Sequence, residues 1–154
     1  MSIERAREHF KKYGVDGRIK EVEVSTATVA EAAKAVGCIA AMIAKTLSFD
    51  IQGKTILILM AGDAKVDNSK YKQEFGIKAK MLQYDEVEER VGHKVGGVCP
   101  FGINENIEVY LDESLNRFEK VYPACGSSNS FIELTIKELE EYSNFVKWVE
   151  ISKV

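Results

Sequence analysis

Apolar residues recur at helical spacing in several parts of the chain. From Ile3 to Tyr13 they fall every three or four positions, which predicts a first helix over residues 2–13 that ends at Gly14. Elsewhere a hydroxyl or carboxylate residue precedes a glutamate by three positions, which is the pattern of a capping box at a helix start. The further helices expected are "VAEAAKAV" after Thr28, a short piece over 39–44, Asp67 to Phe75, "EVEERV" after Asp85, and Thr135 to about Ser143.

Between these segments the apolar pattern becomes that of strands. "IKEVEV" alternates apolar and polar residues, as a half-buried strand does. "KTLSFDI" and "TILILMAG" flank "QGK", which predicts a hairpin whose second strand is buried on both faces. Shorter strands are expected at "AKML", "NIEVYL", "KVYPAC" and "FIEL", and an edge strand over 144–154. Because strands and helices mix without strict alternation, we expect an α+β domain around a mixed, curved sheet.

The composition fits this picture. The 154 residues are enough for one domain, 1–154, with a single core, and 45% hydrophobic with 29% charged residues is typical of a globular protein. The start, "MSIERAREHFKKYG", lacks the apolar segment of a signal peptide, and the longest apolar run is too short to cross a bilayer. We therefore expect a cytoplasmic protein without a membrane partner.

Charge is unevenly distributed along the chain. The net charge of −3 argues against a protein that coats nucleic acid non-specifically, so no DNA partner is expected. The segment from Lys65 to Lys80 nevertheless carries five lysines against two acidic residues. Its lysines, Lys65, Lys70 and Lys72 among them, either contact a phosphate backbone or form a solvated helix face.

The cysteines and histidines offer little for metal or cofactor chemistry. Cys38, Cys99 and Cys125 are odd in number and have no CxxC spacing, so neither a disulfide framework nor a zinc site is indicated. The two histidines, His9 on the first helix and His93, cannot form a metal-binding cluster, and we expect His9 at the surface. No GxGxxG, Walker or HExxH motif occurs, so no cofactor or metal is predicted.

The loop "KVGGVCPFG" stands out for its small, uncharged residues. Gly96 and Gly97 allow positive φ and close approach of a ligand to the backbone, and Pro100 fixes the exit of the turn. Such a loop can direct peptide N–H groups at an oxyanion, worth roughly 3 to 4 kcal/mol per donor. It can equally be a plain connection between helix and strand. Cys99 is a candidate nucleophile only if His93 or another group lowers its pKa.

Two further features have both a chemical and a structural interpretation. Lys45 opens a strand in apolar surroundings, where its side chain either reaches outward to solvent or meets an anion. In "CGSSNSFIEL", Ser127, Ser128 and Asn129 can hydrogen-bond a ribose or an amino group, and they can also simply form a turn.

Six segments together resemble the YbaK family, the stand-alone relatives of the editing domain of bacterial prolyl-tRNA synthetase. They are "TATVAEAAKAVG", "IAKTLSF", "LILMAGDAKVD", "VGGVCPFG", "LDESL" and "GSSNSFIELT", in family order between Thr26 and Leu139. The resemblance implies an α+β fold with a mixed, partly barrel-like sheet and flanking helices. It also implies a metal-independent trans-editing hydrolase that removes a wrong amino acid from the 3′ end of a tRNA, most often the proline tRNA, and leaves open a complex with prolyl-tRNA synthetase.

The resemblance also implies a set of site residues. Main-chain N–H groups of the loop would polarise the ester carbonyl while water, a ribose hydroxyl or a substrate thiol attacks, and Lys45 would hold a phosphate or the ribose. The catalytic positions implied are Lys45, Gly96, Gly97, Val98, Cys99 and Pro100. The substrate-binding positions implied are Thr26, Thr46, Phe101, Gly102, Gly126, Ser127, Ser128 and Asn129. The local positive charge of residues 65–80 adds Lys65, Lys70 and Lys72 as candidate tRNA contacts.

The chain departs from the family pattern at two places that bear on substrate choice. Relatives often carry serine where this chain has Cys99, and some carry a histidine in the segment that here reads "SSNSF". Cysteine, alanine, serine and threonine therefore all remain open as the amino acid removed. Two other functions also remain open: a non-catalytic module that holds tRNA or a synthetase, and a thiol-based redox enzyme that uses Cys99.

Overall fold

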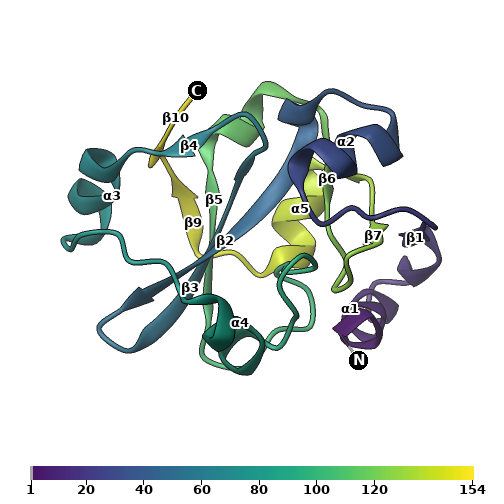
Figure 1. Ribbon diagram of the computed structural model, residues 1–154, viewed down its shortest axis with the longest axis horizontal. Helices are drawn as coiled ribbons and strands as arrows, with labels where there is room; N and C mark the ends of the chain where they lie inside the picture. Colours follow the sequence, from purple (N-terminus) through teal and green to yellow (C-terminus); the bar gives the residue numbers. More distant parts are fainter. Residues whose placement is uncertain (1) are drawn as a thin grey trace.

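The fold is a mixed, curled sheet with helices around it (Figure 1). The computed structural model describes residues 2–154, so Met1 lies outside the described residues. The helices are α1 (Ser2–Lys11), α2 (Val29–Val36), α3 (Asn68–Phe75), α4 (Tyr84–Val91) and α5 (Ile136–Ser143), with 3₁₀ turns η1 (Asp16–Arg18), η2 (Ala40–Met42) and η3 (Glu113–Arg117). In Figure 1, α3 lies at one end of the molecule and α1 and α2 at the other.

The main sheet has six strands in the order β8-β6-β2-β3-β5-β9. Its strands are β2 (Ile43–Ile51), β3 (Lys54–Ala61), β5 (Glu108–Asp112), β6 (Lys120–Pro123), β8 (Leu134–Thr135) and β9 (Lys147–Val149). Antiparallel and parallel pairs are mixed within it, and two small pairs, β1 (Lys20–Glu21) with β7 (Ser130–Phe131) and β4 (Lys65–Val66) with β10 (Ser152–Lys153), flank it. The expected α+β fold class with a mixed, curved sheet is confirmed.

The hairpin at the centre of the sheet follows directly from the sequence pattern. β2 and β3 pair antiparallel from Ala44 opposite Ala61 to Ile51 opposite Lys54. The turn between them has positive φ at Gln52 and Gly53, the requirement of a tight two-residue hairpin turn. β3 is buried over seven consecutive residues, so the prediction of a strand covered on both faces is confirmed.

Helix starts were largely predictable from capping residues. Thr28, Asp67 and Thr135 each accept a hydrogen bond from a main-chain N–H of the first helical turn. The predicted box at Asp85 and Glu88 is wrong, because α4 begins before Asp85. There the carboxylate of Glu86 accepts the N–H of Gln83 at 3.2 Å.

Several predicted strands are shorter than their patterns suggest. "IKEVEV" contributes only β1, and "AKML" makes a single bridge from Met81 to Phe49. The predicted helical piece over 39–44 ends as η2 at Met42, because the next residues pair with β3 and β6 and continue as β2. The C-terminal segment supplies two strands, β9 on the sheet edge and β10 beside β4.

His9 lies in the interior, so its predicted surface position is wrong. It is 9% exposed, and its Nε2 lies 2.6 Å from the carbonyl oxygen of Tyr142. The ring centroids of His9 and Phe101 lie 5.6 Å apart. The helical period predicted a core face that includes Ala6 and Phe10. The buried face of the helix is wide enough to include His9 as well. Within residues 2–154 no helix combines the length and apolarity needed to span a bilayer.

Candidate functional site

A break in strand pairing creates the site. β6 pairs with β2 only at Ile43 and Ala44. Further along the same edge, the N–H of Leu82 donates to the carbonyl of Ser48 (3.1 Å) and the N–H of Asp50 donates to the carbonyl of Lys80 (2.8 Å). These contacts show that even-numbered residues of β2 turn their peptide groups away from β3. Thr46 lies between the two paired regions, so its peptide groups face an edge without a partner strand.

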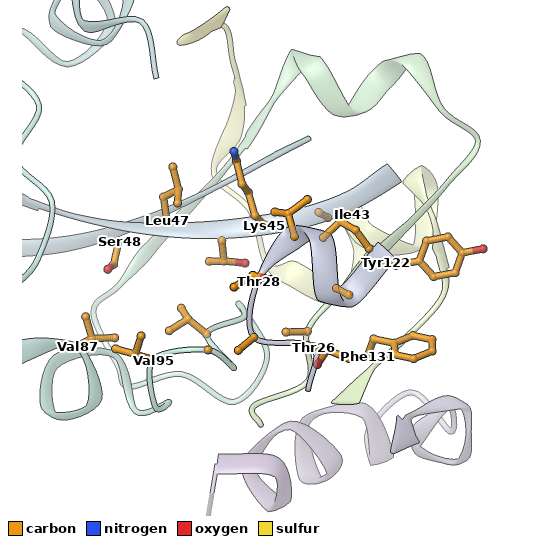
Figure 2. Close-up of a pocket in the computed structure, with 18 of the residues that line it drawn as sticks. Thr26, Thr28, Ile43, Lys45, Leu47, Ser48, Val87, Val95, Tyr122 and Phe131 are labelled. Carbon is orange, nitrogen blue, oxygen red and sulfur yellow. The ribbon is translucent and has the colours of Figure 1, made fainter. Parts of the chain in front are cut away.

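A pocket of about 280 Å³ lies beside this open edge (Figure 2). Its walls come from the start of α2, from β2, and from α4 with the segment before it. The loop over residues 94–102, called the glycine loop below, and strands β6 and β7 complete the lining. The lining is mostly apolar, and among the described residues Lys45 is its only charged one. The lining residues that bear on binding and chemistry are Thr26, Lys45, Thr46, Ser48, Val87, Val95, Gly96, Val98, Tyr122 and Phe131.

The two ends of the pocket differ in chemistry. Tyr122 and Phe131 lie at one end, with ring centroids 6.3 Å apart and planes inclined by 71°. Ser48, Val87 and Val95 lie at the other end in Figure 2. One end therefore presents aromatic surface, and the other presents aliphatic surface with a hydroxyl.

Three hydroxyl groups of the lining make no hydrogen bond within residues 2–154. The Oγ1 atoms of Thr26 and Thr46 are buried without a partner. Ser48 is 6% exposed, and its oxygen points from β2 towards Val87 in Figure 2. A buried hydroxyl without a partner costs about 1–3 kcal/mol, so the two threonine hydroxyls are candidates for binding a ligand, and the Ser48 hydroxyl is free to bind one as well.

The glycine loop contributes main-chain donors to the same pocket. Gly96 has φ of +94° and lines the pocket with Val98. Among the hydrogen bonds of the described chain, none takes up the N–H of Gly96 or of Val98, whereas the N–H of Gly97 closes a turn on the carbonyl of Lys94 at 3.0 Å. Two N–H groups of this loop are thus available to a ligand.

Gly97 serves packing. A Cβ at this position would clash with the main-chain nitrogen of Ser127. The loop therefore lies directly against the backbone of residues 126–127, and the carbonyl of Gly97 accepts the N–H of Gly126 at 2.9 Å. The two neighbouring glycines have different reasons to be glycine: Gly96 needs its positive φ, and Gly97 needs the close approach.

Lys45 lies at the pocket rim, but its ammonium does not approach the glycine loop. Its Nζ donates to the carbonyls of Gly62 (3.3 Å) and Ala64 (2.5 Å). In Figure 2 its side chain leaves β2 on the side opposite to Ser48 and Val95, as strand alternation requires. Burial lowers its pKa, and the neighbouring carboxylate of Asp63 opposes that shift.

The charge of Lys45 has no ion-pair partner of its own within residues 2–154. Asp63 is held by Arg117 in a two-pronged pair, at 2.6 and 3.0 Å. Lys65 is near enough to lower the pKa of Lys45 further. The ammonium is therefore a half-buried cation compensated mainly by carbonyl dipoles, a suitable partner for an incoming anion.

Cys99 lies in the core and outside the pocket, which contradicts its candidacy as a nucleophile. It is fully buried, and burial raises the pKa of its thiol to about 12. Its Sγ lies 3.5 Å from Nε2 of His93, but burial lowers the pKa of that imidazole and keeps it neutral. A neutral imidazole gives no electrostatic help to a thiolate, so neither the catalytic nor the redox role is supported.

We expect the three thiols to differ sharply in reactivity. Cys38 is partly exposed, whereas Cys99 and Cys125 are fully buried. In the native protein at pH 8, a disulfide reagent such as DTNB should therefore titrate one thiol, and all three only after unfolding. Peptide mapping should find the label on Cys38. Fast native labelling of Cys99 would contradict its buried position.

The other residues that the loop motif suggested face away from the pocket. Pro100 and Phe101 are buried on the opposite side of the loop, where the ring of Phe101 lies 4.4 Å from that of Phe10. Gly102 packs against the backbone of Arg5 so closely that a Cβ at this position would clash with the carbonyl oxygen of Arg5. These residues fix the loop to α1 and do not reach a ligand in the pocket.

The segment 126–129 supports the pocket wall from behind. Gly126 has φ of +90° and packs on Ser2. The carbonyl of Ser128 accepts the N–H of Thr26 at 2.6 Å, and Asn129 donates its side-chain amide to the carbonyl of Val22 at 2.9 Å. Ser127 bonds Asn129 and Ser130. The structural interpretation as a turn accounts for these contacts.

The lysines proposed for tRNA lie around α3 and β4. Lys65 and Lys72 are exposed, whereas Lys70 donates to the carbonyl of Ser152 at 2.9 Å. None of the three lines the pocket. Among the described residues, no group of three His, Cys, Asp or Glu side chains is arranged to hold a metal ion.

Sequence reasoning did not predict four of the residues that line the pocket, namely Ser48, Val87, Tyr122 and Phe131. Ser48 and Tyr122 belong to strands that were predicted, but only the pairing order shows that these strands separate beside Thr46. The signal that the sequence did carry is a pair of hydroxyl residues, Thr46 and Ser48, two positions apart in a predicted strand.

Comparison with known proteins gives a consistent result. The sequence model of the aminoacyl-tRNA editing domain matches residues 23–142. YwhH of Bacillus subtilis, described as uncharacterized, is 51% identical over 99% of this chain and 98% of its own. The proline–tRNA ligase of Bacillus cytotoxicus is 31% identical over 85 residues, which are 54% of this chain and 15% of the ligase.

A solved structure shows the same architecture. A protein described as a candidate trans-editing enzyme for prolyl tRNA synthetase superimposes with a TM-score of 0.89 at 29% identity, over 99% of this chain and 98% of that one. The similarity therefore extends over the whole described fold, including every element that lines the pocket.

Proposed function

Because the chain belongs to the aminoacyl-tRNA editing domain family, we propose that it hydrolyses the ester between a small amino acid and a tRNA that was charged with it wrongly. One observation carries the proposal: free N–H groups of Gly96 and Val98 lie in the same pocket as the open edge of β2 at Thr46. Donors of this kind can stabilise the oxyanion that forms when an ester carbonyl is attacked.

The two ends of the pocket suggest how the substrate lies. The terminal base of the tRNA stacks at the aromatic end, on Tyr122 and Phe131. The ester then lies between Gly96 and Thr46, and the amino-acid side chain points towards Ser48 and Val87. The whole pocket, of about 280 Å³, must also hold the base and the ester, which leaves room for a small side chain only.

The chemistry needs little beyond orientation and polarisation. An aminoacyl ester is already activated, so holding its carbonyl against two N–H groups and admitting water or a ribose hydroxyl can suffice. We propose a tRNA for proline as the substrate, because relatives of this chain are a proline–tRNA ligase and a protein linked to prolyl tRNA synthetase. A complex with that synthetase is part of the same proposal.

The test is a deacylation panel. The tRNAs for proline, alanine and threonine are each charged with several small amino acids and incubated with purified protein, with and without a metal chelator. We expect release of a small amino acid from at least one tRNA, unaffected by the chelator. Binding of every charged tRNA without release would instead identify a non-catalytic tRNA-binding module.

A further inference from the structure

We propose that the amino-acid end of the pocket selects a hydroxyl-bearing side chain, so that seryl and threonyl esters are preferred over alanyl esters. This inference rests on the proposed function and names the substrate class of the same site. It follows from two side chains of β2, Ser48 and Thr46, which project from the same side of the strand because they are two residues apart.

Ser48 is the first of these groups. The residue is 6% exposed, and its main-chain carbonyl accepts a hydrogen bond from the N–H of Leu82. Its hydroxyl makes no hydrogen bond within the described chain. Its oxygen points towards Val87 in Figure 2, at the aliphatic end of the pocket. The Ser48 hydroxyl can therefore donate a hydrogen bond to, or accept one from, a ligand group bound at that end.

Thr46 is the second group. Its Oγ1 is buried and unpartnered, and it lies nearer than Ser48 to the end of β2 that pairs with β6. A threonine can exchange the positions of its hydroxyl and methyl groups by rotating about χ1 between staggered wells. A ligand oxygen can therefore draw the Thr46 hydroxyl towards the pocket without changing the volume of the wall.

The chemistry of the lining disfavours other classes of side chain. Among the described residues no acidic one lines the pocket, and the ammonium of Lys45 lies on the other side of β2, so nothing there compensates a charged side chain. An alanyl methyl group leaves the hydroxyls unpaired. A thiol is a weak donor and a weak acceptor, so cysteine satisfies them less well than serine or threonine does.

The first experiment compares matched pairs of amino acids on one tRNA. Serine is compared with alanine, and threonine with valine, and the rate of each deacylation is measured under single-turnover conditions. We expect the hydroxyl-bearing member to react at least about tenfold faster in each pair, because a site built to bind a hydroxyl discriminates against the analogue that lacks it. Equal or faster release of alanine would overturn the inference and leave the proposed function intact.

A second measurement does not depend on turnover. Adenosine carrying serine or alanine through a 3′-amide is stable to hydrolysis, and its affinity can be measured by calorimetry. Tighter binding of the seryl amide is expected, and equal affinities would overturn the inference whether or not the protein hydrolyses esters. Absence of all ester hydrolysis together with tighter seryl binding would instead count against the proposed function.

Variants assign the effect to the hydroxyls. Ser48→Ala should reduce the serine-to-alanine rate ratio by about tenfold. Thr46→Val should reduce it as well and should raise Tm by about 2–4 °C, because a buried unpartnered hydroxyl is replaced by a methyl group of similar size. Ser143→Ala is the matched control: its hydroxyl is also buried and unpartnered but lies outside this pocket, so the ratio should not change. An unchanged ratio in Ser48→Ala would contradict the assignment.

Discussion

Replacement of Gly96 by alanine is expected to reduce kcat for deacylation by about 100-fold or more. Gly96 has φ of +94°, a conformation that costs a residue with a Cβ roughly 1–2 kcal/mol. The added Cβ would also lie 3.2 Å from the Cβ of Ala27. The loop must shift to relieve both, which would move the N–H groups of Gly96 and Val98 away from the position proposed for the oxyanion. Single-turnover kinetics should show the loss in the chemical step.

Gly76→Ala is the matched control for backbone strain. Gly76 has φ of +74° at the C-terminal end of α3, no atom lies within 4 Å of a Cβ built on it, and it lies outside the pocket. It should lose about 1 kcal/mol of unfolding free energy in urea titration while kcat stays at the wild-type value. A Gly96→Ala protein as active as wild type would rule out the role assigned to the loop N–H groups.

The parts of the fold that local physics determines were predictable. The β2–β3 hairpin follows from two apolar runs around a turn that needs positive φ, and α2, α3 and α5 begin where a side chain satisfies free N–H groups. The resemblance to the YbaK family is confirmed by the match over residues 23–142. The order of the strands was beyond the sequence pattern, because it depends on contacts between distant segments.

The candidate site was predictable only in part, and the glycine loop shows why. Five consecutive residues were assigned to one function, but a loop has two sides, so Gly96 and Val98 face the pocket while Cys99 and Pro100 face the core. Spacing along the chain does not reveal which side is which. The same reasoning applies to β2, where side chains alternate between the two faces of the strand. Thr46 and Ser48 therefore lie on one face, and the neighbouring Lys45 projects from the other.

Replacement of Lys45 by methionine is expected to raise KM for mischarged tRNA by about 30- to 100-fold with little change in kcat. Its ammonium is half-buried without an ion pair among the described residues and is held by the carbonyls of Gly62 and Ala64. In the proposed role this ammonium binds a tRNA phosphate, which carries the same charge in the ground state and the transition state, so the interaction would be uniform and would appear in KM. Loss of one charge-assisted contact worth about 2–2.7 kcal/mol gives this magnitude.

The salt dependence of binding tests the same contact independently. Removing one phosphate contact on a single-stranded 3′ end should reduce the slope of log K against log salt by about 0.7. Lys54→Met is the matched control, because Lys54 is an exposed lysine of β3 paired with Glu108 at 3.0 Å and lies outside the pocket. It should leave KM and the slope unchanged. A loss in Lys45→Met confined to kcat would instead place the ammonium at the reacting ester, which would require its side chain to cross to the other side of β2 when substrate binds.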